Sequence, residues 1–491
     1  MTLVVVVLYV VIATWLSLYG FNLIMLSVLS LVHRKDQTVF APLPSGEFPH
    51  VTVQLPIFNE RYVVERLIDG AAALDWPRGK LHIQVLDDST DETTGLARAR
   101  AEFHRAHGVD VVVLHRNDRT GYKAGALEAG LAYSSSPFVA IFDADFVPEP
   151  GFLRRIIPAF SSPDVGWVQA RWIHINESYS PLTHAIALPM DAHFVIEQVA
   201  RSRSGMTTIF NGSAGIWRRA CIDQAGGWQG DTLTEDADLS FRAQMFGWRG
   251  MIMPDVTATS ELPIQIAALK QQYFRWAKGG AQTLRKLWIP VFKSRMPLWK
   301  KVTGLFQLSS YLIPPLVILL QVTWLPIILH PEWINGITTT ILSIATLGVP
   351  IEFALAQIIL YRGDVRRILY LPIFMIIGTG MALNSARGVV QGLSGRNSEF
   401  MRTPKFRMEG ENEAWKRSAY VISGDPTAFG EALMAGYAAF MIMEAWRSGN
   451  TGAIPFLLLY AAGFACVAIG SAVSIRPRGR RSTLHAKADA G

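Results

Sequence analysis

Cysteine and charged residues are scarce in this chain. Its two cysteines, Cys221 and Cys466, lie far apart and fit neither a disulfide framework nor a metal-ligand spacing. We therefore expect free thiols, one in a cytosolic domain and one in a membrane segment. Only 17% of the 491 residues are charged, half are hydrophobic, and the mean hydropathy is +0.24. This composition excludes a wholly soluble protein and predicts that part of the chain lies in lipid.

Acidic residues are also outnumbered, since 46 Lys and Arg face 39 Asp and Glu and the net charge is +7. The basic residues cluster beside apolar segments, which is typical of the cytoplasmic rim of a membrane protein. Nucleic acid is therefore not expected as a partner, whereas membrane lipids are.

The amino-terminal segment is predicted to be a transmembrane helix. Residues 3–32 hold no charged side chain and are followed by Arg34 and Lys35. A signal peptide would carry its positive charge before a shorter apolar core, so we assign residues 1–35 to a retained helix. The positive-inside rule places residue 34 in the cytosol.

Residues 36–262 alternate short apolar runs with helical stretches, which predicts an α/β domain with a mostly parallel sheet. The expected strands are 51–55, 81–86, 109–114, 137–142 and 165–170. In such sheets ligands bind at the carboxyl ends of the strands. Polar residues follow four of these strands: Asn59 and Glu60, Asp87 and Asp88, residues 117–123, and Asp143 and Asp145.

The remaining chain is predicted to lie at or in the membrane. Residues 263–301 carry nine basic and no acidic residues among apolar positions at helical spacing, which is typical of helices in the headgroup layer. We expect two transmembrane helices within 302–390 (302–329 and 336–361) and two within 421–475 (427–446 and 452–475). The segment 368–390 is interpreted as interfacial or re-entrant, because crossing would place the basic loop 391–420 outside. Residues 476–491 would be a basic cytosolic tail.

The stretch 230–242 packs four carboxylates into eight residues at the start of a helical pattern. Capping of that helix by Thr234 and Asp236 is one interpretation. The other is catalytic. A sugar hydroxyl has a pKa far above neutrality, so its attack on an anomeric carbon needs a carboxylate to accept the proton, and Asp236 is the candidate base.

Further charged residues suit the binding of a nucleoside diphosphate. Asp143 and Asp145 point to the same side of a strand end, and two carboxylates held together suit a hard divalent cation, although a strand-end turn is the alternative. Either Asp87 or Asp88 can accept hydrogen bonds from a base and a ribose; the alternative is that the stretch caps the helix that begins near Glu92, through Ser89 or Thr90. Lys123 lies among small residues and can neutralise a phosphate.

The basic segment 263–301 holds the pattern Gln272-x-x-Arg275-Trp276. Arg275 can pair with diphosphate oxygens that gain charge as a sugar leaves, and Trp276 offers a face on which a sugar ring can stack. An interfacial helix with an aromatic anchor and a snorkelling arginine is the alternative interpretation.

The combined pattern resembles a known family. The chain resembles the inverting family 2 glycosyltransferases of the cellulose synthase superfamily. The resemblance is carried by four motifs that precede transmembrane helices, in this order: Asp88, Asp143-x-Asp145, Thr234-Glu235-Asp236 and Gln272-x-x-Arg275-Trp276. The runs 210–218 and 227–236 look most like the plant mannan and glucomannan synthase branch and its bacterial relatives. The resemblance covers roughly residues 50–420 and implies a Rossmann-like GT-A domain inserted between transmembrane helices.

The resemblance also implies roles for individual residues. Donor binding would fall to Asp87, Asp88, Lys123, Asp143, Gln272 and Arg275, and Mg²⁺ or Mn²⁺ would bind Asp143 and Asp145. Catalysis would involve Asp236 as base with Glu235 and Arg275, and Trp276 and Asn211 would contact the acceptor. The loop with Phe400, Arg402, Thr403 and Lys405 is similar to the family's gating loop, although Arg402 and Pro404 depart from its valine-and-threonine form. An arginine-rich module for a cyclic dinucleotide is missing, as is the family's extra amino-terminal helix, so no such regulation is expected.

These observations predict a multi-pass enzyme of the plasma or inner membrane with a cytosolic catalytic domain. It would transfer a hexose from UDP-glucose or GDP-mannose to a growing β-linked polysaccharide and translocate the product processively. A glycolipid synthase acting on ceramide or diacylglycerol is the main alternative. A transporter with a nucleotide-sensing domain would require charges inside its spans, and Glu352 is the exception among otherwise uncharged ones.

Overall fold

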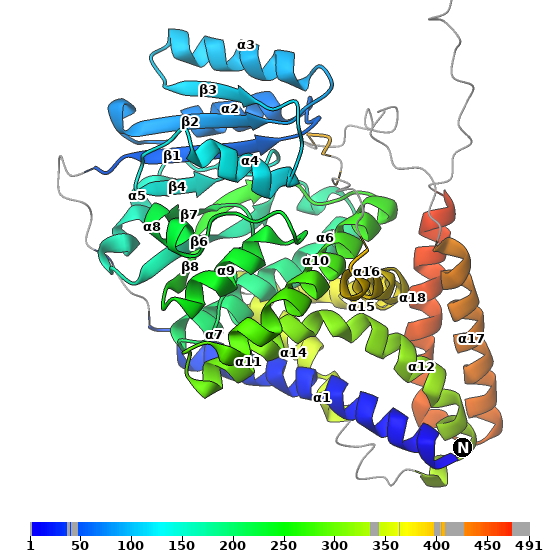
Figure 1. The fold of residues 1–491 in the computed structure, drawn as a ribbon. Helices are drawn as coiled ribbons and strands as arrows, with labels where there is room; N and C mark the ends of the chain where they lie inside the picture. The colour runs from blue at the N-terminus through cyan, green and yellow to red at the C-terminus, as the bar shows by residue number, and fades with distance from the viewer. Residues whose placement is uncertain are drawn as a thin grey trace, which may run out of the picture.

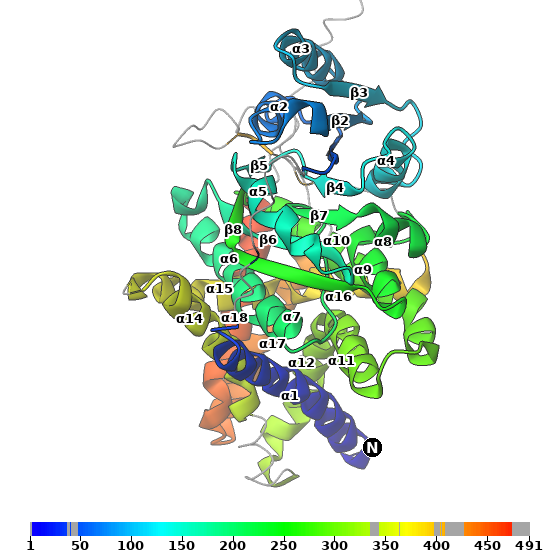
Figure 2. The same ribbon diagram turned by 90° about the vertical axis from the view of Figure 1, so that its left-hand side faces the viewer.

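The computed structural model describes residues 2–36, 40, 48–333, 343–362, 364–396, 403, 405–407 and 427–473. An α/β domain occupies one side of the molecule, and long apolar helices lie below and beside it (Figure 1). Seen from the side, the sheet and its covering helices form layers above helix α1, Thr2–Val32 (Figure 2).

One mixed sheet organises the α/β domain. Its strands are β1 Val51–Ile57, β2 Leu81–Asp87, β3 Val111–His115, β4 Phe138–Ile141, β5 Val147–Pro148, β6 Val165–His174, β7 Gly215–Arg218 and β8 Arg249–Ser260. The order is β3-β2-β1-β4-β7-β6-β8-β5. Four pairs are parallel: β1 with β2, β1 with β4, β2 with β3, and β6 with β8. Three pairs are antiparallel: β4 with β7, β6 with β7, and β5 with β8. The predicted α/β fold with a mostly parallel sheet is confirmed.

Helices cover both faces of this sheet. The face formed by Val53, Val85 and Phe142 packs against α2 Val64–Ala72, α3 Thr93–Ala106 and α5 Phe152–Ile156. The opposite face packs against α4 Tyr122–Leu131, α8 Arg219–Gln224 and α9 Glu235–Met245, around the stacked indoles of Trp167 and Trp217. Alternating side chains of the fully buried strands supply both cores, which is why these strands appear as nearly continuous apolar runs in the sequence.

The sheet brings distant polar residues to one edge. In the parallel register Ile57 lies beside Asp87, and Gln54 beside Ile141, so β1, β2 and β4 end next to one another. The residues that follow these strands therefore converge. A long helical segment, α6 Pro181–Ala192, η4 His193–Glu197 and α7 Gln198–Arg203, packs against β6 and β8.

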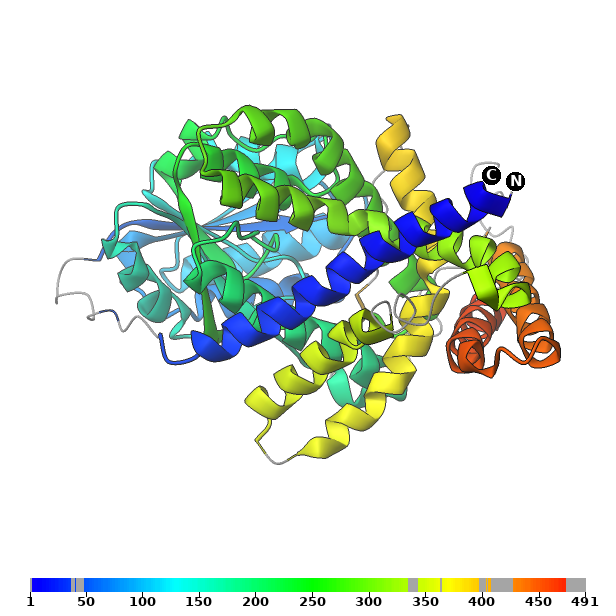
Figure 3. The same ribbon diagram turned by 90° about the horizontal axis from the view of Figure 1, so that it is seen from below.

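The carboxy-terminal half is helical. It contains α10 Ile266–Lys293, α11 Leu298–Ser309, α12 Ile313–Leu329, α14 Gly348–Leu360, α15 Leu371–Gly380, α16 Ala382–Ser394, α17 Ala428–Arg447 and α18 Ile454–Val473. Shorter 3₁₀ segments are η1 Arg78–Lys80, η2 Ile157–Ser161, η3 Glu177–Tyr179, η5 Ser310–Leu312, η6 Pro331–Trp333, η7 Val365–Tyr370 and η9 Thr451–Ala453. From below, α1 lies across the domain and the other apolar helices (Figure 3).

Within the described residues, four helical segments are long and apolar enough to cross a membrane: Leu3–Val32, Leu298–Leu329, Ser343–Leu360 and Thr451–Val473. Helix α17 falls outside this group, so the predicted span 427–446 stays a prediction. The segment interpreted as re-entrant is a helix pair, Val365–Gly380 and Ala382–Ser394, bent by 45°. The predicted tail 476–491 lies outside the described residues. Cys221 is buried, Cys466 is exposed, and both are free as expected, whereas their placement in the cytosol and in the membrane stays a prediction.

A buried ion pair joins α10 to the last two helices. Lys270 Nζ lies 2.6 Å from Glu431 Oε1 and donates to Ser471 Oγ at 2.9 Å. The carbonyl of the same lysine accepts a hydrogen bond from Asn384 Nδ2 on α16. These contacts fix the start of α10, two residues before Gln272, against the apolar helices.

Candidate active site

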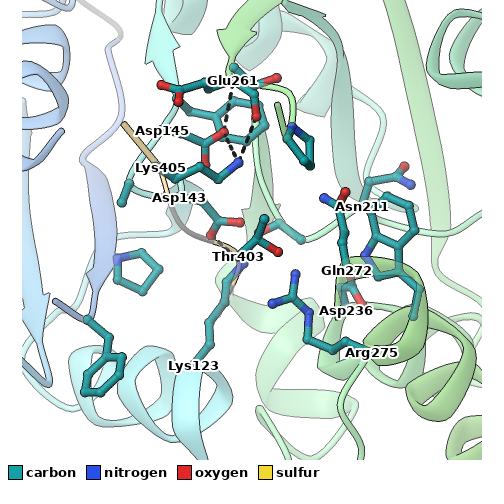
Figure 4. Close-up of a pocket in the computed structure, with 18 of the residues that line it drawn as sticks. Lys123, Asp143, Asp145, Asn211, Asp236, Glu261, Gln272, Arg275, Thr403 and Lys405 are labelled. Atoms are coloured by element: carbon teal, nitrogen blue, oxygen red, sulfur yellow. Dashed lines mark hydrogen bonds and ion pairs between the residues drawn. The ribbon is translucent and has the colours of Figure 1, made fainter. Parts of the chain in front are cut away.

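A pocket at the carboxyl edge of the sheet collects most of the predicted site residues (Figure 4). The predicted residues that line it are Asp88, Lys123, Asp143, Asp145, Asn211, Glu235, Asp236, Gln272, Arg275, Trp276, Thr403 and Lys405. They come from strand ends, from the starts of α4 and α9, and from α10. Carboxylates, cations and one indole therefore share a single cavity.

The two carboxylates after β4 each face a lysine. Asp143 Oδ1 lies 2.5 Å from Lys123 Nζ. Asp145 Oδ2 accepts hydrogen bonds from Lys405 Nζ at 2.9 Å and from the Glu261 backbone amide at 3.0 Å. Burial acts to raise the pKa of Asp145, but the Lys405 ammonium outweighs it and holds that pKa below its ordinary value. Asp145 is therefore ionised at neutral pH.

This pair of carboxylates fits a hard divalent cation. Both are acceptor-only groups on the same pocket wall, and each is paired with a cationic group in this structure. In the part of the chain that the structure describes, no three His, Cys, Asp or Glu side chains cluster as a metal site. A cation held by Asp143 and Asp145 would thus take its other ligands from water and from the diphosphate of a donor.

The start of α9 places Glu235 and Asp236 at the floor of the pocket. Lys123 Nζ donates to the Gly212 carbonyl at 2.8 Å and lies 3.7 Å from Glu235 Oε1. Gly212 has φ +80°, and a Cβ there would lie 2.9 Å from Asp236 Oδ2, so only glycine fits beside that carboxylate. Burial first, and then the neighbouring Glu235 carboxylate, raises the pKa of Asp236 to about 7.

The capping interpretation of this stretch is wrong for Thr234. It occupies the N-cap position of α9, but its side chain makes no capping hydrogen bond. Its hydroxyl instead lies 3.0 Å from Thr283 Oγ1 on α10. Asp236 Oδ1 accepts a hydrogen bond from the Ala237 amide at 2.8 Å, which orients the carboxylate at the helix start. Thr234, a residue type that often caps helices, therefore connects the start of α9 to α10 instead.

Helix α10 presents Gln272, Arg275 and Trp276 to the pocket. Burial lowers the pKa of Arg275, against the opposing effect of Asp143, Glu235 and Asp236, and the guanidinium stays charged because its ordinary value is so high. Figure 4 shows Arg275 reaching toward Asp236 and Lys123. A cation is thus held in the pocket beside the carboxylates Asp143, Glu235 and Asp236.

The two aspartates after β2 have separate surroundings. Asp87 is fully buried, and its carboxylate accepts hydrogen bonds from the Ser89 amide and Thr94 Oγ1 and contacts His115 Nδ1 at 2.8 Å. It does not line the pocket, and its predicted role in donor binding stays a prediction. Asp88 lines the pocket and pairs with Arg116 at 2.6 Å.

Several pocket residues carried no signal in the sequence. Trp172, His174 and Glu261 lie at the ends of β6 and β8. His174 Nδ1 lies 2.9 Å from Ser260 Oγ, and burial together with the nearby Lys405 lowers the pKa of His174 to about 3, so the imidazole is neutral. Only the pairing of β6 with β8 brings them to the site, and no local motif marks that pairing.

The loop predicted to gate the pocket is described only in part. Thr403 and Lys405 line the cavity, and the Phe406 amide donates to Glu261 Oε1 at 2.9 Å. Phe400 and Arg402 lie outside the described residues. The gating role of this loop stays a prediction.

The layered fold, the polar pocket at its strand ends and the apolar helices after it define a GT-A domain associated with membrane helices. A family model described as glycosyltransferase like family 2 matches residues 49–279. Glucomannan 4-beta-mannosyltransferase 2 of Arabidopsis thaliana is 35% identical over 82% of this chain and 76% of its own length. Glucomannan 4-beta-mannosyltransferase 1 of Oryza sativa subsp. japonica is 32% identical over 89% of this chain and 85% of its own length.

Among solved structures, mannosyltransferase PcManGT from Pyrobaculum calidifontis, in complex with GDP-Man and Mn²⁺, superposes with a TM-score of 0.56 at 22% identity. The match covers 79% of this chain and all of that one, and it supports the fold. The chain belongs to the family 2 glycosyltransferases, in the cellulose synthase-like group that contains the glucomannan mannosyltransferases.

Proposed function

We propose that the protein is a membrane-bound inverting hexosyltransferase that extends a β-linked polysaccharide of the mannan type. One observation carries the proposal: Asp143, Asp236, Arg275 and Trp276, from distant parts of the sequence, line one pocket. The names of the plant relatives support the mannan type of product. GDP-mannose is the preferred donor candidate over UDP-glucose, since PcManGT is bound to GDP-Man.

In the proposed reaction an acceptor hydroxyl attacks the anomeric carbon of the donor sugar in a single displacement. Asp236 accepts the hydroxyl proton as the new glycosidic bond forms. The bond between the anomeric carbon and the diphosphate breaks, and Arg275 and Lys123 stabilise the charge on the departing oxygens. Trp276 holds the acceptor sugar on its indole face.

A divalent cation, Mg²⁺ or Mn²⁺, is proposed to bind Asp143 and Asp145 together with the donor diphosphate. It would neutralise the diphosphate together with the cationic side chains of the pocket, Lys123 and Arg275 among them. Lys405 pairs with Asp145 at 2.9 Å, so a cation bound to Asp145 would compete with this lysine for the carboxylate. This competition would couple Lys405, and with it the predicted gating role, to binding of the donor and the cation.

The membrane arrangement follows from the sequence expectations. We propose that the catalytic domain faces the cytosol of a plasma or inner membrane, where nucleotide sugars are made, and that the product leaves processively through the apolar helices. Asn384 and the Lys270–Glu431 pair hold α10 against those helices, which supports a direct path from the pocket into them. The rival proposal is a glycolipid synthase with a lipid acceptor.

The test is a donor screen with the full-length protein in detergent or nanodiscs. Release of GDP or UDP is measured for GDP-mannose, UDP-glucose and other nucleotide sugars, and the radiolabelled product is sized. Long product degraded by an endo-β-mannanase supports the proposal. Label confined to a lipid extract would support the rival, and no release with any donor would refute both.

A further inference from the structure

A helical segment beside the pocket exposes two polar side chains in an otherwise buried stretch. Between Asp191 and Arg201 every residue is buried except His193 and Glu197. Their side chains keep 25% and 29% of their surface accessible, and they begin and end a π-helical turn. Such turns interrupt α-helices mostly where a side chain is needed in a particular place. Two hydrogen-bonding groups therefore remain accessible in a tightly packed region.

His193 is connected to the pocket wall through Asn211. Gln198 Nε2 donates to Asn211 Oδ1 at 3.0 Å, which fixes the orientation of that amide. Asn211 Nδ2 then donates to His193 Nε2 at 2.9 Å. Because an amide nitrogen only donates, Nε2 accepts, and a neutral His193 carries its proton on Nδ1. That nitrogen lies 3.7 Å from Glu197 Oε1.

Glu197 is an ionised carboxylate on the same side of the molecule as the proposed base. Burial acts to raise the pKa of Glu197, but His193 and Arg201 outweigh it and hold that pKa below its ordinary value.

These groups have the chemistry that carbohydrate hydroxyls require. Histidine Nδ1 is a donor and the carboxylate is an acceptor. No step of the proposed transfer uses them. The guanidinium of buried Arg201 balances the charge of Glu197, so this carboxylate is kept ionised on a helix that is otherwise buried.

We propose that His193 and Glu197 form an acceptor subsite, which binds hydroxyl groups of the sugar chain behind the terminal sugar that reacts at Asp236. This inference rests on the proposed transferase function and deepens it, since it says where the acceptor continues after leaving Trp276. The ligand class is a neutral oligosaccharide rich in hydroxyl groups. A polar pair of this kind orients such a chain without holding it tightly.

The test is steady-state kinetics of His193→Ala and Glu197→Gln in the full-length protein. Acceptors are unlabelled β-linked manno-oligosaccharides of one to six sugars, and nucleotide release gives the rate. We expect the KM for the longer acceptors to rise about tenfold in each variant, the loss of roughly one hydrogen bond to a charged or polarised group. The donor KM should stay within about twofold, because the donor residues are untouched.

Acceptor length separates a subsite from a general defect. In the wild-type protein the KM should fall as the acceptor grows, and this gain should shrink in both variants. His82→Ala is the matched control, since His82 pairs with Asp110 at 2.8 Å in a similar histidine–carboxylate contact on a distant strand. Thermal unfolding of each variant verifies that it is folded. If Glu197→Gln is unstable because Arg201 loses its charge partner, His193→Ala alone still tests the subsite.

The outcomes are distinguishable. Unchanged acceptor KM and unchanged length dependence in a folded His193→Ala variant would overturn the subsite while leaving the transferase function intact. A parallel rise in the donor KM would also overturn it, since the effect would then be on the whole pocket. Absence of acceptor-dependent nucleotide release in the wild-type protein with every donor would overturn the proposed function and, with it, the subsite.

Discussion

The pH dependence of sugar transfer tests the proposed base quantitatively. Asp236 accepts a proton only when it is ionised, and its pKa is raised to about 7 by burial and by Glu235. The value of kcat/KM should therefore be level above pH 8 and fall about tenfold for each pH unit below 7. At pH 6 the rate should be roughly one tenth of its plateau, whereas an ordinary aspartate would still be fully active there.

Two variants should move this midpoint in opposite directions. Lys123 favours the ionised form of Asp236, so Lys123→Met should raise the midpoint above 7. Glu235 disfavours it, so Glu235→Gln should lower the midpoint below 7, and this shift is measurable even if the maximum rate falls. Because the two carboxylates titrate together, the midpoint belongs to the pair.

The assay is nucleotide release from the donor at saturating metal and low acceptor, measured between pH 5 and 9. Asp110→Asn, at an exposed carboxylate on the far edge of the sheet, serves as the control and should leave the midpoint unchanged. A wild-type midpoint near 4, or shifts of the same sign in both variants, would refute the assignment of Asp236 as the base.

The remaining predictions concern stability and metal. Either Lys270→Met or Glu431→Leu alone should lower the free energy of unfolding by ~3–5 kcal/mol, because each leaves one buried charge without its partner. The double variant should recover much of this loss, since it leaves no buried charge. Unchanged melting temperatures in the single variants would contradict this. Gly280→Ala should lower the free energy of unfolding by ~1–3 kcal/mol, since the new Cβ would lie 2.2 Å from the ring of Tyr311. Gly436→Ala is the control, because open space surrounds that position, and it should leave the melting temperature unchanged. Chelation should abolish transfer until Mn²⁺ or Mg²⁺ is restored, and Asp145→Asn should raise the half-saturating metal concentration by about tenfold or more; full activity in chelator would exclude a metal role.

The sequence predicted the parts of the fold that have a local signature. Buried parallel strands are continuous apolar runs, so β1, β2, β4 and β6 begin within a residue of the predicted positions. The carboxylates after β4 and at the start of α9 were predicted to share a site because their combined pattern resembles that of the family 2 glycosyltransferases. The pocket contains them all.

What escaped prediction depends on contacts between distant segments. β5, β7 and β8 are set by antiparallel pairing and by a long crossover to β6, which periodicity does not reveal. Asp87 and Asp88 are adjacent in sequence, yet strand alternation buries the first and leaves the second facing the pocket. His193 and Glu197 had no motif, since their significance comes from selective exposure on a buried helix.

The most direct test of the account is transfer by Asp236→Asn. The asparagine has the same shape but accepts no proton at neutral pH, so GDP-mannose should bind with nearly wild-type affinity while incorporation of labelled mannose into polymer falls by at least about a hundredfold. Undiminished incorporation by the folded variant, or loss of donor binding together with transfer, would contradict the assignment of this pocket as a sugar-transfer site with Asp236 as its base.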